Sequence, residues 1–252
     1  TRAVRLLEKR VTCRLYSYLD DLLVVSDTED SHVEDIEEIL KALTEVGFKA
    51  RLKKCNFGFE ELKYLGVIIG KNGIRADPAK IRAIVDFPAP STITAVRSFI
   101  GMCSYMRRFI KGFASIAAPF QELTKKEKDN PTPVKKSQPI QWSPELEKAF
   151  QKLKHSITTS PALIPARPGH PFTMESDSST IALGSVLLQS KEEGGPLHVV
   201  CYASRKLTPA ERNYPIIELE ALGLVFGLRS FHHFVWGSPI TAVTDHKPLL
   251  SL

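Results

Sequence analysis

The chain has 252 residues, of which 43% are hydrophobic and 25% charged, with 14 glycines, 17 prolines and 4 cysteines. This composition excludes a collagen-like, low-complexity or wholly disordered chain, and no apolar run approaches the ~20 residues that a membrane-spanning helix needs. The net charge of +6 is uneven, because residues 91–160 carry 12 basic and 5 acidic side chains whereas residues 171–252 carry 6 and 8. The basic middle segment suits a polyanion such as nucleic acid, although a solvated lysine-rich surface gives the same count. With its four cysteines widely spaced, we expect a soluble intracellular protein with reduced thiols and no membrane partner.

The N-terminal elements begin with a strand pair. The text RLYSYLDDLLVVS places two β-prone stretches around a polar pair, which predicts a tight hairpin with Asp20 and Asp21 at its tip. The spacing of Ser31 and Glu34 is that of a capping box, so a helix is expected to begin there and to stop at Gly47. Its apolar face is expected to comprise Ile36, Ile39, Leu40, Leu43 and Val46.

A second hairpin and a short helix follow. This second hairpin is predicted at Tyr64 to Ile69, with Asn72-Gly73 as its turn. Asp77 is a plausible N-cap and Pro78 suits the first turn of the next helix.

A longer helix is predicted from Thr92 to Phe113. Its apolar stripe follows the 3.6-residue period at Val96, Phe99, Ile100, Cys103, Met106, Ile110 and Phe113. On that helix Arg97, Arg108 and Lys111 would fall along one cationic line beside the stripe. Residues 125–138 are rich in Lys and Pro and predict a loop.

The last 110 residues predict a helix followed by an α/β module. Ser143-Pro144 opens the helix, with Leu146, Phe150, Leu153 and Ile157 directed inward. Strands are expected at residues 171–176, 182–189, 199–204 and 240–244, with a helix at 214–236 before the last strand. That helix is apolar almost all round, so we expect it to be buried against the sheet.

Two sets of carboxylates could carry chemistry. Asp20 and Asp21 are adjacent like charges, and divalent metals of the kind used in phosphoryl transfer would compensate them, although an ordinary acidic turn is the alternative. Asp177 and Asp245 end strands and Glu220 lies within the apolar helix, so the three could converge on an oxygen-ligand site for Mg²⁺ or Mn²⁺. Each of the three also has an alternative role as a cap or turn residue.

The residues also resemble a known family. Tyr18-Leu19-Asp20-Asp21 reads as the YxDD motif of reverse transcriptases, and later phrases resemble the polymerase to ribonuclease H region of gypsy-type long-terminal-repeat retrotransposon Pol polyproteins. The matching phrases, in family order, are KKCNFGFEELKYLGVIIGKNGIRADPAKIRAI (53–84), VRSFIGMCSYMRRFI (96–110), QWSPELEKAFQKLK (141–154), SDSSTIALGSVLLQ (176–189), CYASRKLTPAERNY (201–214) and TDHKPL (244–249). Coincidence is negligible for six collinear blocks.

The resemblance implies a multidomain fold of the α/β and α+β classes. It implies the C-terminal part of a polymerase palm at 1–75, a helical thumb at 76–130, a connection at 131–170 and a truncated ribonuclease H-like mixed sheet with its helix at 171–252. The implied protein is a multifunctional enzyme, an RNA-directed DNA polymerase (nucleotidyltransferase) and endonuclease that uses Mg²⁺ or Mn²⁺. Its partners would be an RNA/DNA template-primer duplex, deoxynucleotides and the rest of the polyprotein, in the cytoplasm or in virus-like particles.

The resemblance also assigns residue roles. Asp20 and Asp21 would hold metal for polymerisation, and Asp177, Glu220 and Asp245 would do so for hydrolysis of RNA in hybrids. A second set would contact nucleic acid: Tyr64, Leu65 and Gly66 at the primer end, and Arg97, Arg108 and Lys111 at backbone phosphates. Lys53 or Lys54 is a candidate general acid toward pyrophosphate.

The family's sites use further residues that these 252 residues do not contain. One is a third polymerase Asp upstream, and another is a fourth ribonuclease H acid downstream, so we expect the chain alone to be inactive. A non-catalytic remnant, or a domesticated nucleic-acid-binding fragment, is the alternative function.

Overall fold

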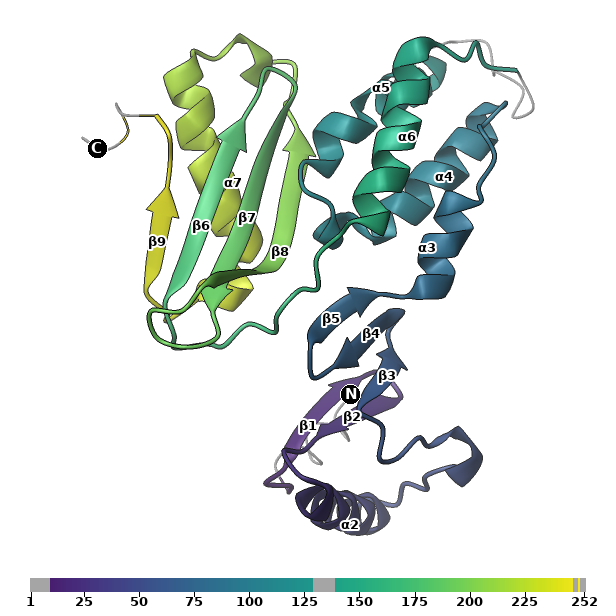
Figure 1. Cartoon of the computed structure of the whole chain (residues 1–252), viewed down its shortest axis with the longest axis vertical. Coiled ribbons are helices and arrows are strands. Elements are labelled where there is room, and N and C mark those ends of the chain that lie inside the picture. The colour runs from purple at the N-terminus through teal and green to yellow at the C-terminus, as the bar shows by residue number, and fades with distance from the viewer. Residues whose placement is uncertain (1–9, 129–138, 247–248, 250–252) are drawn as a thin grey trace. The chain divides into compact units, whose positions relative to one another are not determined.

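The computed structural model describes residues 10–128, 139–246 and 249. The chain divides into two compact units, Thr1–Leu65 and Gly66–Leu252, each considered by itself (Figure 1). None of the helices within the described residues is both long and apolar enough to cross a membrane. All four cysteines are free thiols.

The first unit opens with the predicted hairpin. Strands β1 (Arg14–Tyr18) and β2 (Asp21–Val25) pair antiparallel, and the register of Tyr18 with Asp21 leaves Leu19 and Asp20 as a two-residue turn. Leu19 has a φ of 54°, whereas Asp20 has no positive φ. That combination is the pattern of a type II′ turn, whose twist matches the twist of the flanking strands.

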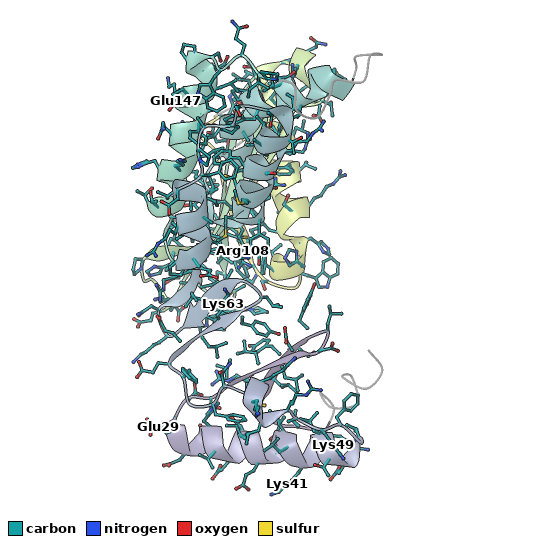
Figure 2. The ribbon with its side chains drawn as sticks, turned by 90° about the vertical axis from the view of Figure 1, so that its right-hand side faces the viewer. Glu29, Lys41, Lys49, Lys63, Arg108 and Glu147 are labelled. Atoms are coloured by element: carbon teal, nitrogen blue, oxygen red, sulfur yellow. The ribbon has the colours of Figure 1, made fainter. Side chains whose placement is uncertain are left out.

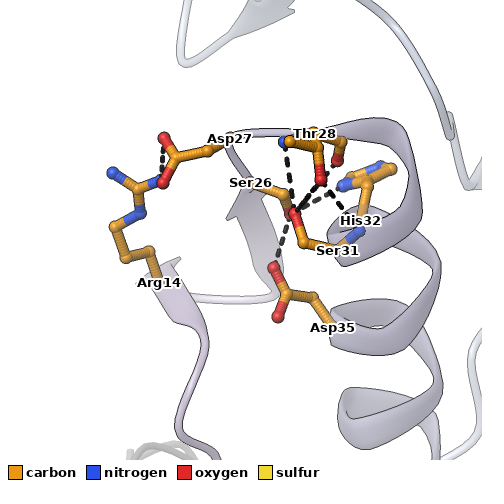
Figure 3. A network of polar contacts seen from close by, with 7 residues as sticks. All are labelled: Arg14, Ser26, Asp27, Thr28, Ser31, His32 and Asp35. Carbon is orange, nitrogen blue, oxygen red and sulfur yellow. Dashed lines mark hydrogen bonds and ion pairs between the residues drawn. The ribbon is translucent and has the colours of Figure 1, made fainter.

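Helix α2 (Glu29–Glu45) begins earlier than its sequence pattern predicted. Thr28 is the N-cap: its hydroxyl accepts the Ser31 N–H at 3.1 Å, and the Ser31 hydroxyl accepts the Thr28 N–H at 3.2 Å (Figure 3). The expected box of Ser31 with Glu34 is therefore wrong, because Ser31 already occupies the third helical position and takes the reciprocal role itself. The expected stop is confirmed, since Gly47 follows the helix with a φ of 79°.

Polar side chains dock α2 on the hairpin. The Ser26 hydroxyl donates to Asp35 at 2.5 Å, His32 Nδ1 lies 3.0 Å from the same hydroxyl, and Arg14 pairs with Asp27 (Figure 3). The expected apolar face is only partly buried, because Ile39 is buried whereas Leu40 is exposed. The remaining elements of this unit are the 3-10 helix η1 (Leu52–Lys54) and strand β3 (Glu61–Tyr64).

The second unit starts with another hairpin. Strands β4 (Val67–Gly70) and β5 (Gly73–Ala76) pair with Gly70 opposite Gly73, so the turn is Lys71-Asn72 and not the predicted Asn72-Gly73. The predicted second hairpin is thus present with its turn one residue earlier, and Leu65 and Gly66, which precede it, have φ of 47° and 74°.

Four helices follow the hairpin in the described part of the chain: α3 (Pro78–Val85), α4 (Ile93–Tyr105), α5 (Phe113–Lys128) and α6 (Pro144–Thr158). The predicted N-cap is confirmed, since the Asp77 carboxylate accepts the Ala79 N–H at 2.9 Å. The start of α6 at Ser143 is confirmed in the same way by the Leu146 N–H at 3.2 Å. Residues 129–138, the greater part of the predicted loop, lie outside the described residues, while 125–128 belong to α5.

The predicted single helix from Thr92 to Phe113 is wrong. It is three elements: α4, the 3-10 helix η2 (Arg107–Phe109) and the start of α5. Ile110 is extended and Gly112 has a φ of 63°, so the chain turns between them. The apolar period misled the prediction because Met106, Ile110 and Phe113 are all buried in the same core despite the break.

That core joins the four helices. Its aromatic centre has Phe99 against Phe150 at 4.6 Å between ring centroids, with Phe87, Phe120 and Trp142 around them. The residues predicted to face inward on α6 are all buried: Leu146, Phe150, Leu153 and Ile157. Aromatic packing of this kind holds the helices in fixed relation.

The last part of the unit is the predicted α/β module. Its sheet has the order β8-β7-β6-β9, with β6 (Phe172–Ser178), β7 (Ala182–Ser190) and β8 (Leu197–Lys206) antiparallel and β9 (Ile240–Val243) parallel to β6 (Figure 1). The 3-10 helix η3 (Glu211–Asn213) precedes α7 (Ile216–Val235), which packs on β6 and β7. The predicted order of strands and helix is confirmed.

Only one face of α7 is covered in the described structure. Gly223, Gly227 and Phe231 are buried, whereas Val225 and Leu228 on the outer face are 43% and 40% exposed. The expected burial of this helix against the sheet is therefore confirmed for the inner face, and the outer face stays partly exposed.

Candidate functional site

The paired aspartates of the first unit lie where the sequence predicted, at the tip of the hairpin. Asp20 is the second residue of the turn and Asp21 is the first of β2, and both are exposed. Leu19 sets their position with a left-handed φ of 54°, a conformation that costs a non-glycine residue about 1–3 kcal/mol. The side chain of Leu19 is 71% exposed, so burial does not compensate for this strain.

Tyr64 shares the neighbourhood of Asp21. Partial burial raises the pKa of the Tyr64 phenol, and the negative charge of Asp21 raises it further. Lys53 and Lys54 lie in η1 and are exposed. The role of these two lysines as general acid stays a prediction.

The second candidate site is at the carboxyl ends of two parallel strands. Glu175 of β6 lies opposite Val243 of β9, the last pair of the register, and Asp177 and Asp245 each follow two residues later. Asp177 lies within β6 and Asp245 follows the end of β9. Two acids that are 68 positions apart in the sequence therefore lie toward the same end of the β6–β9 pair.

Helix α7 supplies Glu220. The helix approaches the sheet through Gly223, where an added Cβ would lie 2.5 Å from the Ser178 hydroxyl, and through Gly227, where it would lie 2.6 Å from Met174 Sδ. Glu220 is one turn before Gly223, so the close packing of the helix at Gly223 also places the Glu220 carboxylate near the ends of the strands. Glu220 is 7% exposed, and the neighbouring Ser178 hydroxyl donates to the Leu219 carbonyl at 3.0 Å.

The electrostatics of Glu220 connect the three acids. Burial raises the pKa of the Glu220 carboxyl, and the charges of Asp245 and Asp177 raise it further, against smaller lowering effects from His246 and from a hydrogen bond with Ser178. Its Oε2 atom is buried and has no hydrogen-bond partner among the described residues. An unpaired buried carboxylate oxygen beside two other carboxylates fits a hard divalent cation better than it fits a folded core.

The three acids are neighbours without forming a compact cluster. Among the described residues, the one set of three candidate ligand groups with every ligand atom within 4.8 Å of the others is Cys13, Asp35 and Glu38 in the first unit. Local structure explains that set, because Glu38 accepts the Thr12 and Cys13 backbone N–H groups and Asp35 accepts the Ser26 hydroxyl. The shared metal role of Asp177, Glu220 and Asp245 stays a prediction.

The three basic residues do not share one helix face. Arg97 is on α4, Arg108 is on η2, and Lys111 is in the turn before α5. Arg108 (Figure 2) lies near β8: burial raises the pKa of the Cys201 thiol to about 12, and the charge of Arg108 opposes that rise. The predicted single cationic line is therefore wrong, for the same reason that the single helix is wrong.

Lys111 faces the sheet. It lines a cavity of about 100 Å³ together with Glu175, Asp177 and Tyr202. Burial raises the pKa of the Tyr202 phenol, and the charge of Glu175 raises it further. Lys111 is thus placed beside two acids of β6.

Sequence reasoning missed the residues that support the acids. Gly223 and Ser178 determine how closely α7 packs on the sheet, and His246 lowers the pKa of the Glu220 carboxyl. A glycine pair four residues apart in an apolar helix was the available signal, since such glycines mark close approach to a neighbouring element. Ser178 and His246 had no signal beyond adjacency to a predicted acid.

Comparison with known families matches both halves of the chain. Residues 1–69 match a family described as reverse transcriptase (RNA-dependent DNA polymerase), and residues 142–242 match an RNase H-like domain found in reverse transcriptase. The chain is similar to the retrovirus-related Pol polyproteins of the transposons gypsy and opus of Drosophila melanogaster, with 37% and 34% identity over 93% of its length. It spans only 22% and 23% of the length of these two relatives.

Solved structures share the fold. Two foamy viral protease-reverse transcriptase structures superimpose with a TM-score of 0.81 at 20–21% identity, one in complex with an RNA/DNA hybrid and one with double-stranded DNA. The match covers 98% of this chain and 32% of the first, and 100% of this chain and 51% of the second. The predicted fold class is confirmed.

Proposed function

We propose, on the premise that this chain belongs to the reverse transcriptase and ribonuclease H region of retrotransposon Pol polyproteins, that its two sets of acids serve two phosphoryl-transfer reactions. In the full-length protein these would be extension of a primer on a template and hydrolysis of the RNA strand of an RNA/DNA hybrid. The observation that supports this most directly is Glu220, a buried carboxylate with an unpaired oxygen whose neighbours include two further carboxylates.

Asp20 and Asp21 would serve the polymerase half. Domains of both matched families generally depend on divalent metal ions, and when bound, Mg²⁺ or Mn²⁺ would supply charge stabilisation to the attacking and leaving oxygens. The type II′ turn presents both carboxylates to solvent from a rigid hairpin tip. Tyr64, close enough to feel the charge of Asp21, would border the position of the primer end.

Asp177, Glu220 and Asp245 would serve the ribonuclease half. The charges of Asp177 and Asp245 both act on Glu220, and the close contact of α7 with the sheet at Gly223 supports the placement of Glu220 near the strand ends. Three carboxylates in one neighbourhood repel one another, so the arrangement favours uptake of a hard cation.

One experiment tests the polymerase half. In the full-length parent, Asp20→Asn combined with Asp21→Asn should abolish primer extension and leave affinity for a template-primer duplex intact, because the fold and the basic surface are unchanged. Asp30→Asn, a change of an exposed acid in the first turn of α2, is the matched control and should extend normally. Extension by the double variant would refute the assignment.

A second experiment tests the ribonuclease half. Glu220→Gln should lower hybrid cleavage by the full-length protein at least ~100-fold, whereas Glu218→Gln, an exposed acid on the same helix, should cleave normally. In the 252-residue chain, Mn²⁺ should broaden the NMR signals of Asp177 and Asp245, and Glu220→Gln should weaken that broadening. Equal broadening in the Glu220→Gln chain would show that Glu220 holds no metal.

A further inference from the structure

The turn at Gly66 is braced by two side chains of the helices that follow it. Gly66 has a φ of 74°, and a Cβ added there would overlap both the Tyr105 hydroxyl and the Lys80 ammonium. The backbone at Gly66 is therefore in direct contact with side chains from α3 and α4. Any other residue at this position would be strained and would also displace both groups.

Lys80 and Tyr105 are also in contact with each other. The Lys80 ammonium lies 3.4 Å from the centroid of the Tyr105 ring, inside the range of a cation–π interaction. Tyr105 is 51% exposed, so about half of its surface is in contact with solvent. The lysine lies against the face of this ring, next to the Gly66 backbone.

The position of Lys80 in its helix is unfavourable by itself. It is the third residue of α3, and a cation in the first turn of a helix opposes the positive end of the helix dipole. The helix dipole does not favour a lysine at this position, whereas the contacts with Tyr105 and Gly66 give it a local structural role.

We propose that Lys80 is a positioning residue for the Gly66 turn: it holds the ring of Tyr105 against the Gly66 backbone and so keeps the turn in its left-handed conformation. This inference rests on the proposed function, in which the turn borders the primer strand of a bound duplex. Lys80 acts through Tyr105 and Gly66 and does not itself bind a phosphate.

The test separates positioning from phosphate contact. Lys80→Met keeps the length of the side chain and removes its charge, and it should weaken binding of the 252-residue chain to an RNA/DNA duplex about twofold to fivefold. The slope of log K against log salt should stay unchanged, whereas loss of a phosphate contact would reduce it by about one unit. Lys80→Arg should restore most of the affinity, because arginine also makes cation–π contacts.

Two further measurements complete the design. Lys71→Met removes the same charge from an exposed turn of the same unit and should leave affinity unchanged. Tyr105→Leu should abolish the upfield ring-current shift of the Lys80 side-chain protons, and adding Lys80→Met to it should weaken binding no further.

The outcomes are distinguishable. A reduced salt slope in Lys80→Met, unaltered affinity, or additive losses in the double variant would each overturn the role of Lys80 while leaving the proposed function standing. If the unsubstituted chain does not bind the duplex, the proposed binding function is refuted. The role of Lys80 in duplex binding is then refuted too, even if the ring-current shift is present.

Discussion

Replacing Gly223 with alanine tests whether the close approach of α7 to the sheet sets the position of Glu220. The new Cβ would lie 2.5 Å from the Ser178 hydroxyl, about 1 Å inside the 3.4–4 Å range of an ordinary contact. Because Ser178 also donates to the Leu219 carbonyl, moving its hydroxyl away loses a hydrogen bond in the same turn as Glu220. Either the helix rises from the sheet or the serine rotates, and both disturb the carboxylate.

The expected magnitude follows from two opposing effects. Overpacking of this kind costs about 1–3 kcal/mol, while alanine in a helix is better than glycine by about 0.5–1 kcal/mol. We therefore expect Gly223→Ala to lower the free energy of unfolding by ~0.5–2 kcal/mol. Gly101→Ala is the matched control: it is also a helical glycine, but an added Cβ there meets nothing within 4 Å, so it should stabilise the chain.

Urea unfolding of the 252-residue chain measures both changes, and hybrid cleavage by the full-length protein measures the consequence. Ser178→Gly removes the obstructing hydroxyl, so combined with Gly223→Ala it should show a favourable coupling of about 1 kcal/mol. Stabilisation of Gly223→Ala to the same extent as Gly101→Ala would refute the packing argument. Destabilisation with unaltered hybrid cleavage would refute the link from that packing to Glu220.

Three further predictions concern single groups. The pKa of the Glu220 carboxyl is raised above its ordinary 4.5 in the folded protein, so the free energy of unfolding should fall as pH rises from 4.5 through the raised pKa. Glu220→Gln should remove this pH-dependent loss and should be more stable than the unsubstituted chain at pH values above the raised pKa. Urea unfolding at a series of pH values measures both effects. Leu19→Gly should stabilise the first unit by about 1 kcal/mol, because glycine adopts the left-handed turn without strain, and no gain in thermal unfolding would contradict this. Ser204→Ala should cost about 1–3 kcal/mol and speed hydrogen exchange at the Ala114 amide, since the buried Ser204 hydroxyl accepts that N–H at 3.0 Å; unchanged exchange would show that the bond is unimportant.

Local signals in the sequence were enough for most elements. The hairpin around Asp20 could be predicted because β-prone residues on both sides of a polar pair encode strand and turn together. The helix caps at Asp77 and Ser143 could be predicted because each is a contact between residues two or three positions apart. The capping box of α2 was misplaced because a serine at the third helical position can take the role of the expected glutamate. The pairs Thr28 with Ser31 and Ser31 with Glu34 therefore both fit the spacing of a capping box.

Contacts between distant segments could not be predicted in this way. The break between α4 and α5 left no trace in the apolar period, because Met106, Ile110 and Phe113 are buried whichever element carries them. The pairing of β6 with β9 joins residues separated by a whole helix, so nothing local reveals that Asp177 and Asp245 are neighbours. For those acids the residue pattern gave a shared site only as one of two alternatives, and the resemblance to a family assigned them the shared role.

Hydrogen bonds and an ion pair join α5 and the segment after α6 to the strands of the second unit. Ser204 of β8 accepts an N–H from the first turn of α5, and Glu122 near the other end of that helix pairs with Lys206 of the same strand. Leu163 exchanges two backbone hydrogen bonds with Ile74 of β5, and the next residue donates its N–H to Val199 of β8. These bonds cross the boundaries at residues 130 and 170 that the resemblance implies. Because each bond satisfies a backbone or charged group of one segment with a group of another, separating the segments would leave buried polar groups unpaired, which gives the second unit a physical reason to unfold as one.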